Sequence, residues 1–195
     1  YPTLLLYPDS ETLDRKMYDL VSPWADLVYV KIYKSPEEKY PWTETELGHP
    51  VFPMLTKAEC GFEQTGDYQA YIKEPTFEGY IPILIERKGG AKGKSGADDI
   101  YPTLSSQKRR HVFYDEIGRF YGDPRFTRMY IIAECSMADY IKYVPKFNGK
   151  TKNVNHVSMS VPSREATIAG LFIRDCPVVF MSTRLRATHF YKNLI

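Results

Sequence analysis

The sequence has few cysteines, little net charge and no long apolar run. Its three cysteines, Cys60, Cys135 and Cys176, are odd in number and far apart. That spacing fits neither a disulfide framework nor the closely spaced ligands of a zinc site. We therefore expect reduced thiols that are at least partly buried.

The net charge of +2 on 195 residues excludes nucleic-acid binding through bulk positive charge. Any such binding must depend on where the basic residues lie. No apolar run approaches the roughly 18 residues that cross a bilayer, and no segment resembles a signal peptide. These absences predict a nuclear protein, or a cytoplasmic one in a prokaryote or a virus-infected host.

The composition, 43% apolar and 26% charged, is ordinary for a globular protein. The length fits a single domain. Residues 34–62 contain four prolines and are expected to be mostly loop. A short strand and a helix are expected within residues 1–26. Runs rich in apolar and β-branched residues predict further strands: 27–33, 66–72, 81–88, 128–134 and 176–181.

Helices are predicted between these strands. An amphipathic pattern starts at Asp98 or Asp99 and continues to residue 121, with Val112, Phe113, Ile117 and Phe120 on one apolar face. Shorter helices are expected over 136–143, over 164–174 with Ser163 as N-cap, and after Thr183 to Asn193. Strands alternating with helices after residue 80 predict an α/β sheet covered by helices.

The strand 81–88 looks buried, yet it ends in Glu86-Arg87-Lys88. Residues two apart on a strand point to the same face, so Glu86 and Lys88 face one pocket and Arg87 points the other way. If the strand 66–72 pairs with it in the antiparallel sense, Asp67 lies beside Glu86 and Lys88. A solvated ion pair at an exposed strand end is the alternative.

Two carboxylates and a lysine in one pocket can together bind a metal ion and assist hydrolysis. The carboxylate oxygens of Asp67 and Glu86 suit hard cations such as Mg²⁺ or Mn²⁺. Such an ion polarises a phosphoryl oxygen and activates water, while Lys88 assists the attacking water or stabilises charge. The pattern is typical of metal-dependent phosphodiester hydrolysis.

The order of these residues resembles the XPF-type structure-specific endonuclease domain. The resemblance is carried by Gly66-Asp67, by Glu86-Arg87-Lys88, by Asp99 before Ile100-Tyr101, by "KRRHVFYDEI" and by "MYIIAE". The closing segment "VPSREATIAGLFIRDCPVVF" is also similar. The resemblance covers residues 60–195, so residues 1–60 are taken as a divergent N-terminal part of one nuclease domain.

The resemblance implies a restriction-endonuclease-like fold, with a central mixed sheet flanked by helices. It implies Mg²⁺-dependent cleavage of DNA, usually at branches, flaps or junctions. Asp67 and Glu86 are implied as metal ligands, Lys88 as the catalytic lysine, and Arg87 and Asp99 as supporting residues.

The family tends to dimerise through its closing helices, so residues 164–174 and 183–193 are expected to lie in a homodimer or heterodimer interface. Large members also carry a helix-hairpin-helix pair or a helicase domain. This chain is therefore expected to be a minimal version, such as a viral one, or one domain of a larger protein.

The chain departs from the family pattern in two places. Ten residues, 89–98, separate Lys88 from Asp99, where the family has three. The family also has an Asp and an Arg-Glu pair on its first strand. Here Tyr33 or Lys34 stands where that Asp would be, and Glu37 or Glu38 could replace the Glu. The missing Asp leaves a second function open, an inactive family member that binds DNA or a protein as a scaffold.

The inserted loop contains Gly93-Lys94-Ser95, but a Walker motif would need glycine at position 88, which is lysine, so an ATP site is not expected. Glu134, at the end of the strand 128–134, is expected to be a capping or solvated carboxylate, with a role beside the pocket as the alternative. Basic residues near the site are expected to contact DNA phosphates: Lys92, Lys94, Lys108, Arg109 and Arg110.

Overall fold

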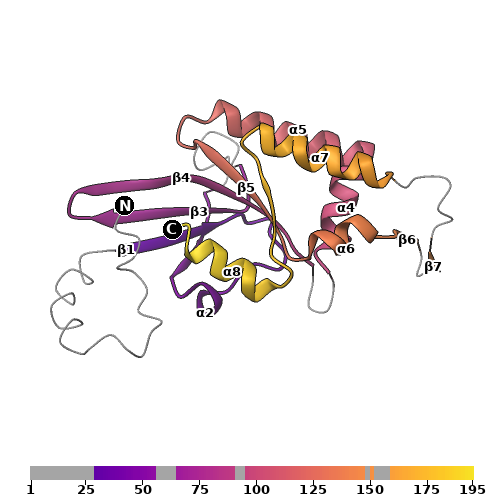
Figure 1. Cartoon of the computed structure of the whole chain (residues 1–195). Coiled ribbons are helices and arrows are strands. Elements are labelled where there is room, and N and C mark those ends of the chain that lie inside the picture. The colour runs from indigo at the N-terminus through magenta and orange to yellow at the C-terminus, as the bar shows by residue number, and fades with distance from the viewer. Residues whose placement is uncertain (1–28, 56–64, 91–94, 148–149, 152–158) are drawn as a thin grey trace.

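The computed structural model describes residues 29–55, 65–90, 95–147, 150–151 and 159–195. Six strands form one sheet in the order β2-β1-β3-β4-β5-β8 (Figure 1). Their bounds are β1 Tyr29–Lys34, β2 Val51–Pro53, β3 Tyr68–Glu74, β4 Phe77–Lys88, β5 Arg128–Ala133 and β8 Val178–Phe180. A separate two-stranded pair consists of β6 (Lys146–Phe147) and β7 (Lys150–Thr151).

The large sheet is mixed. Strand β3 is antiparallel to both of its neighbours, β1 and β4. The pairs β1–β2, β4–β5 and β5–β8 are parallel. Helices flank both faces (Figure 1), so the predicted α/β class with a central mixed sheet is confirmed.

Two apolar clusters bind the helices to the sheet. One face carries α4 (Ala97–Ser105), α5 (Gln107–Gly122) and α7 (Val161–Ile173), and the other carries α2 (Glu44–Leu47) and α8 (Arg184–Lys192). The short α6 (Met137–Lys142) follows β5. Neighbouring residues of β4 divide between the faces, since Leu84 belongs to the first cluster and Ile85 to the second. Strands buried on both faces read as continuous apolar runs, which is why the sequence shows them clearly.

The β3–β4 hairpin is longer than predicted. Only Pro75 and Thr76 separate the two strands, and the pairing continues outward through Tyr71 with Tyr80 and Lys73 with Glu78. The predicted strands 66–72 and 81–88 left out residues 73–80, but most of these residues are paired, because cross-strand pairs of aromatic and charged side chains stabilise this exposed part.

Several helix boundaries also differ from expectation. The single helix expected after residue 98 is two helices, because Ser106 has extended backbone and ends α4. Phe113 and its apolar partners are buried, but Val112 is 57% exposed and does not share their face. The N-cap of α7 is Ser160, whose Oγ accepts from the Ser163 N–H, and not Ser163 itself. Thr183 caps α8 as predicted.

Other predictions have mixed outcomes. Within residues 34–55, mostly expected as loop, the chain forms β2 and the capped turn α2. Cys135 and Cys176 are free and buried, as expected. The predicted elements of residues 1–26, and Cys60, lie outside the described residues. In the described part of the chain, no helix has the length and apolarity needed to cross a membrane.

Candidate active site

The start of β3 and the end of β4 bring three predicted residues together. The Asp67 N–H donates to the Ile85 carbonyl at 2.7 Å, and the Arg87 N–H donates to Asp67 Oδ2 at 2.7 Å. These two bonds hold the Asp67 carboxyl against the last residues of β4. The antiparallel pairing therefore places Asp67 beside Glu86 and Lys88, as the sequence pattern predicted.

Gly66 makes this approach possible. Its φ of +73° lies in the left-handed region, which favours glycine. A Cβ at this position would lie 2.7 Å from Leu84 Cγ and 3.0 Å from the Ile85 carbonyl oxygen. Any side chain here would push the Asp67 segment away from β4.

Glu86 and Lys88 form an ion pair below the surface. Glu86 is only 3% exposed, and its Oε1 binds the Lys88 ammonium. Its other oxygen, Oε2, is buried and has no hydrogen-bond partner among the described residues. A buried carboxylate oxygen without a donor is costly and calls for a proton or a cation.

The electrostatics of the site follow from burial and charge. Burial, followed by the negative charge of Glu86, raises the pKa of Asp67 well above its usual range. Burial alone would lower the pKa of Lys88, but the charges of Glu86, Asp67 and Asp99 outweigh it and raise that pKa. The Lys88 side chain is therefore a fixed cation among carboxyl groups.

Asp99 and Glu38 border the same site. Asp99 lies in the first turn of α4, where burial raises its pKa, while the nearby Lys88 acts in the opposite direction. Glu38 follows β1 and accepts from Arg87 Nη1 at 3.3 Å. Its charge acts on both Asp67 and Asp99. Of the two upstream acids that the sequence left open, Glu38 is at the site and Glu37 is exposed.

Arg87 points to the opposite face, as predicted, and is 2% exposed. Its Nε and Nη2 donate to the two oxygens of Glu134 at 2.8 and 2.7 Å. Trp42 Nε1 also donates to Glu134 at 2.8 Å. The expectation that Glu134 is a capping or solvated carboxylate was wrong, because the buried guanidinium of Arg87 needs it as a bidentate partner.

Comparison with models of known protein families finds no match, and comparison with curated proteins finds none either. Among solved structures, the chain is similar to XPF from Aeropyrum pernix, with 15% sequence identity and a TM-score of 0.48. The similarity covers 84% of this chain and 62% of that one. The chain thus spans less than two thirds of that protein, and its function must be argued from its own side chains.

Glu116 is the site residue that the sequence analysis missed. It lies on α5, and burial, followed by the charge of Glu86, raises its pKa to about 8. The nearby Glu86 carboxylate therefore favours the protonated form of Glu116. The signal was present in the sequence: Glu116 lies three residues after Phe113 and beside Ile117, on the apolar face of the helix.

The predicted DNA-binding residues have different outcomes. Arg109 and Arg110 are exposed on the first turn of α5, and Arg109 is close enough to act on the pKa of Asp99. Lys92 and Lys94 lie outside the described residues, as does the side chain of Lys108. The roles of all five in binding DNA stay predictions.

The carboxyl groups fit a hard divalent cation of the Mg²⁺ type. In the described part of the chain, no three His, Cys, Asp or Glu side chains are arranged to enclose a metal ion. Mg²⁺, however, usually binds through one or two carboxylates together with water and substrate phosphates. Asp67 and the unpartnered Oε2 of Glu86 match that requirement.

Proposed function

We propose that this chain is a metal-dependent nuclease that hydrolyses phosphodiester bonds in DNA. The observation that carries the proposal is the buried Glu86 carboxylate, which has an unpartnered oxygen beside Asp67 and an ion pair with Lys88. A purely structural ion pair would have no reason to leave a buried oxygen without a donor.

Asp67 and Glu86 would hold Mg²⁺ or Mn²⁺. When bound, the ion would polarise a phosphoryl oxygen and lower the pKa of a coordinated water. Lys88 occupies Glu86 Oε1, which leaves Oε2 as the oxygen of Glu86 for a cation. Asp99 would support this end of the site from α4.

Lys88 would act as a fixed positive charge. Because its neighbours keep the ammonium protonated, it cannot serve as the general base. Instead it would donate a hydrogen bond to the attacking water or to the phosphoryl oxygens as negative charge develops. Arg87 would position the strand end, since its guanidinium binds Glu134 on the other face.

The substrate would be branched, flap or junction DNA. Arg109 and Arg110 on α5, together with Lys92, Lys94 and Lys108, would contact phosphates next to the scissile bond. Such contacts position DNA without reading its sequence, which suits a nuclease that recognises DNA structure.

The test is cleavage of labelled single-stranded, duplex, flap, splayed-arm and nicked DNA with Mg²⁺ or Mn²⁺. Glu86→Gln and Lys88→Met should each reduce cleavage at least about 100-fold. Asp115→Asn removes an exposed acid from α5 and should leave the rate unchanged. Cleavage that survives both site substitutions would refute the assignment.

A second candidate is an inactive relative that binds DNA or a protein as a scaffold. It is favoured by the missing upstream Asp, since Tyr33 or Lys34 stands where the family has that residue. DNA binding without cleavage in either metal, equal in wild type and Glu86→Gln, would support the scaffold over the nuclease.

A further inference from the structure

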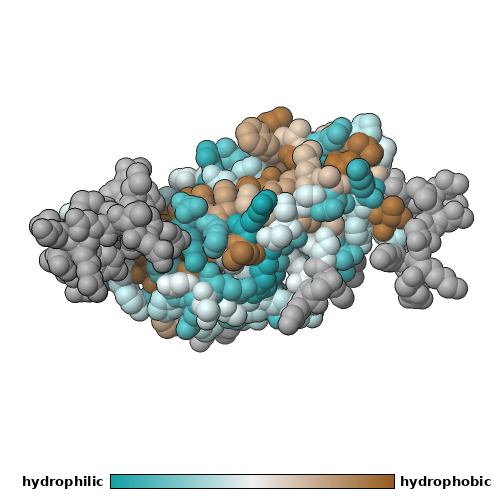
Figure 2. Space-filling model, turned by 60° about the horizontal axis from the view of Figure 1, so that its bottom comes forward, coloured by the Kyte–Doolittle hydropathy of each residue, from teal (hydrophilic) through white to brown (hydrophobic). Residues whose placement is uncertain are grey.

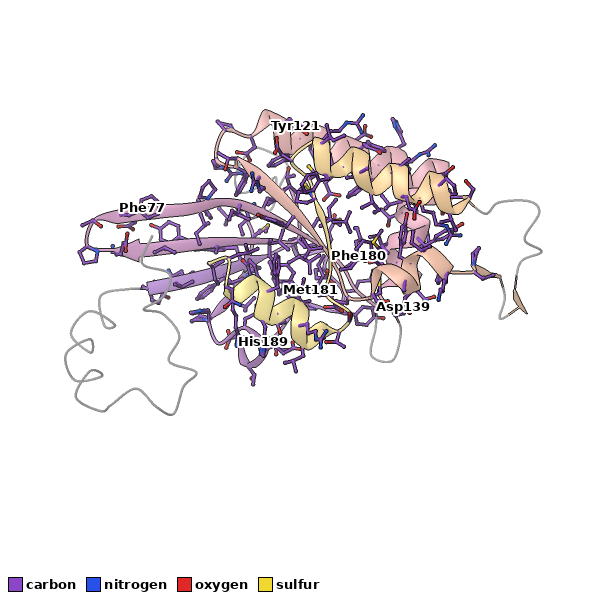
Figure 3. All side chains as sticks on the ribbon, in the orientation of Figure 1. Phe77, Tyr121, Asp139, Phe180, Met181 and His189 are labelled. Carbon is purple, nitrogen blue, oxygen red and sulfur yellow. The ribbon has the colours of Figure 1, made fainter. Side chains whose placement is uncertain are left out.

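The sheet carries a second group of side chains that could bind a ligand, aromatic rings with basic residues beside them, away from the carboxyl groups. In Figure 1, the hairpin end of β3 and β4 and the start of β1 extend beyond the described helices. Phe77, labelled in Figure 3, marks the tip of this hairpin. From this extension towards β2, one face of the sheet carries four aromatic rings.

The four rings form a continuous cluster, here called the aromatic platform. Its members are Tyr33 of β1, Phe52 of β2, Tyr71 of β3 and Tyr80 of β4. Ring centroids are 6.0 Å apart for Tyr33 and Phe52, 5.9 Å for Tyr33 and Tyr80, and 5.4 Å for Tyr71 and Tyr80. Phe52 is 37% and Tyr80 36% exposed, so the cluster is open to solvent.

Positive charges border the platform. The Lys31 ammonium lies 5.5 Å from the Phe52 centroid and 4.9 Å from that of Tyr29. The Arg125 guanidinium, which is paired with Asp123 at 2.6 Å, lies 5.7 Å from the Tyr80 centroid. On the same face, Glu78 is paired with Lys73 at 3.0 Å. Nucleobases stack on aromatic rings and phosphates pair with cations, so this surface matches single-stranded nucleic acid.

The aliphatic side chains of β1 and β3 next to the platform lie on the other face of the sheet. Val30, Ile32 and Ile72 alternate with the platform residues and pack into the cluster on the α8 side. On the platform side the rings alternate with these aliphatic residues, and Lys31 and Arg125 lie beside the rings, a combination on which successive bases can stack.

The platform and the carboxyl groups lie on one face of the sheet. Tyr80 pairs with Tyr71, and Leu84 pairs with Gln69, two residues from Tyr71 on the same strand. Tyr80, Leu84 and Glu86 therefore share a face. Six residues of strand separate Tyr80 from Glu86, about 20 Å, which a few nucleotides can span.

We propose that the aromatic platform binds a single-stranded DNA arm of the substrate and guides it towards the carboxyl groups at the other end of β4. The inference rests on the proposed nuclease function, because it names the part of the DNA that this function would engage. Its test nevertheless needs no cleavage.

The experiment measures the affinity of fluorescein-labelled oligo-dT by anisotropy in EDTA, where no cleavage occurs. The double substitution Tyr33→Ala with Tyr80→Ala should weaken binding at least about 10-fold, because two of the rings on which bases would stack are lost. Replacing both residues with Phe should keep the affinity, since the rings remain. Tyr121→Ala removes an exposed ring of α5 (Figure 3) and should have no effect.

A second measurement needs no substitution. Oligonucleotides containing 5-iodouracil, as DNA and as RNA, are photocrosslinked to the wild-type protein and the modified peptides are mapped. Crosslinks at the platform rings with the DNA oligonucleotide are expected. Crosslinks confined to other segments would overturn the proposal, as would platform crosslinks formed by the RNA oligonucleotide alone.

The remaining outcomes separate the two proposals. Unchanged oligo-dT affinity in the folded alanine variant would overturn the platform proposal, and so would a change in oligomeric state without a change in affinity. If Glu86→Gln and wild type bind oligo-dT equally, the alanine variant loses binding and no protein cleaves DNA, the platform proposal holds and the nuclease proposal fails.

Discussion

At the scale of single residues, the unusual feature of the site is the number of carboxyl groups that share one cation. Asp67, Glu86, Asp99 and Glu116 all act electrostatically on Lys88 or are acted on by it. Without a divalent ion, some of these groups must hold protons to limit mutual repulsion. The pH dependence of stability should report this.

Glu116→Gln should make the metal-free protein more stable at alkaline pH. The pKa of Glu116 rises from 4.5 to about 8 on folding, so folding favours its protonated form. Protonated Glu116 makes its full contribution to the free energy of unfolding below pH 4.5. As the pH rises from there towards 8, that free energy falls by at most about 1.4 kcal/mol per pH unit. Glutamine stays neutral and removes this loss.

The measurement is urea unfolding in EDTA between pH 5 and about 9. The wild-type curve should fall with pH more steeply than that of Glu116→Gln, while Asp115→Asn, an exposed neighbour on α5, should follow the wild type. Parallel curves for wild type and Glu116→Gln would contradict the prediction.

Glycine at position 66 provides a second residue-scale prediction. Gly66→Ala should lower the free energy of unfolding by about 1–3 kcal/mol and reduce metal binding, because a Cβ would collide with Leu84 and Ile85. Gly118 lies within α5 with open space around it, so Gly118→Ala should stabilise by about 0.5–1 kcal/mol. Equal effects of the two substitutions in thermal unfolding would refute this explanation.

At the scale of elements, the end of β4 is held from both faces. Glu86 and Lys88 face α4 and α5, while Arg87 binds Glu134, which follows β5, and Glu38, which follows β1. The position of this end of β4 therefore depends on three separate parts of the chain. This arrangement explains why a charged tripeptide can end a buried strand.

Arg87→Ala should destabilise the protein by roughly 3–5 kcal/mol, because Glu134 would be left as a buried carboxylate without its cation. Urea unfolding followed by circular dichroism measures the change. Lys73→Ala breaks an ion pair whose side chains are 60% and 50% exposed and should cost less than about 1 kcal/mol. A small effect of Arg87→Ala would mean that water replaces the ion pair.

At the scale of the whole molecule, the closing helices lie on opposite faces of the sheet. Leu171 of α7 packs in the α4–α5 cluster, whereas Ala187 and Tyr191 of α8 pack in the other. Between them, β8 is an edge strand of the sheet. The view in Figure 2 shows hydrophobic residues mainly in the upper half of the face, above a hydrophilic lower half.

We expect self-association at the β8 edge, through both closing helices. Phe172 and Ile173 at the end of α7 are 70% and 80% exposed, and Leu185 at the start of α8 is 64% exposed. Sedimentation over a concentration series should show a dimer that Phe172→Ser with Ile173→Ser weakens at least about 10-fold. Phe77→Ser, which removes an exposed ring at the tip of the β3–β4 hairpin, serves as the control, and a wild-type monomer at all concentrations would refute the expectation.

The sequence by itself determined the central strands, the cap at Thr183, and the approach of Asp67 to Glu86 and Lys88. These follow from local rules: buried strands are continuous apolar runs, and an antiparallel hairpin brings the residues at the strand ends together. Only the tertiary structure decided the burial of Glu134, the approach of Glu116 to Glu86 and the aromatic platform. Each depends on side chains from distant segments, such as Arg87 with Glu134 or Phe52 with Tyr33, and no local pattern fixes which strands and helices will meet.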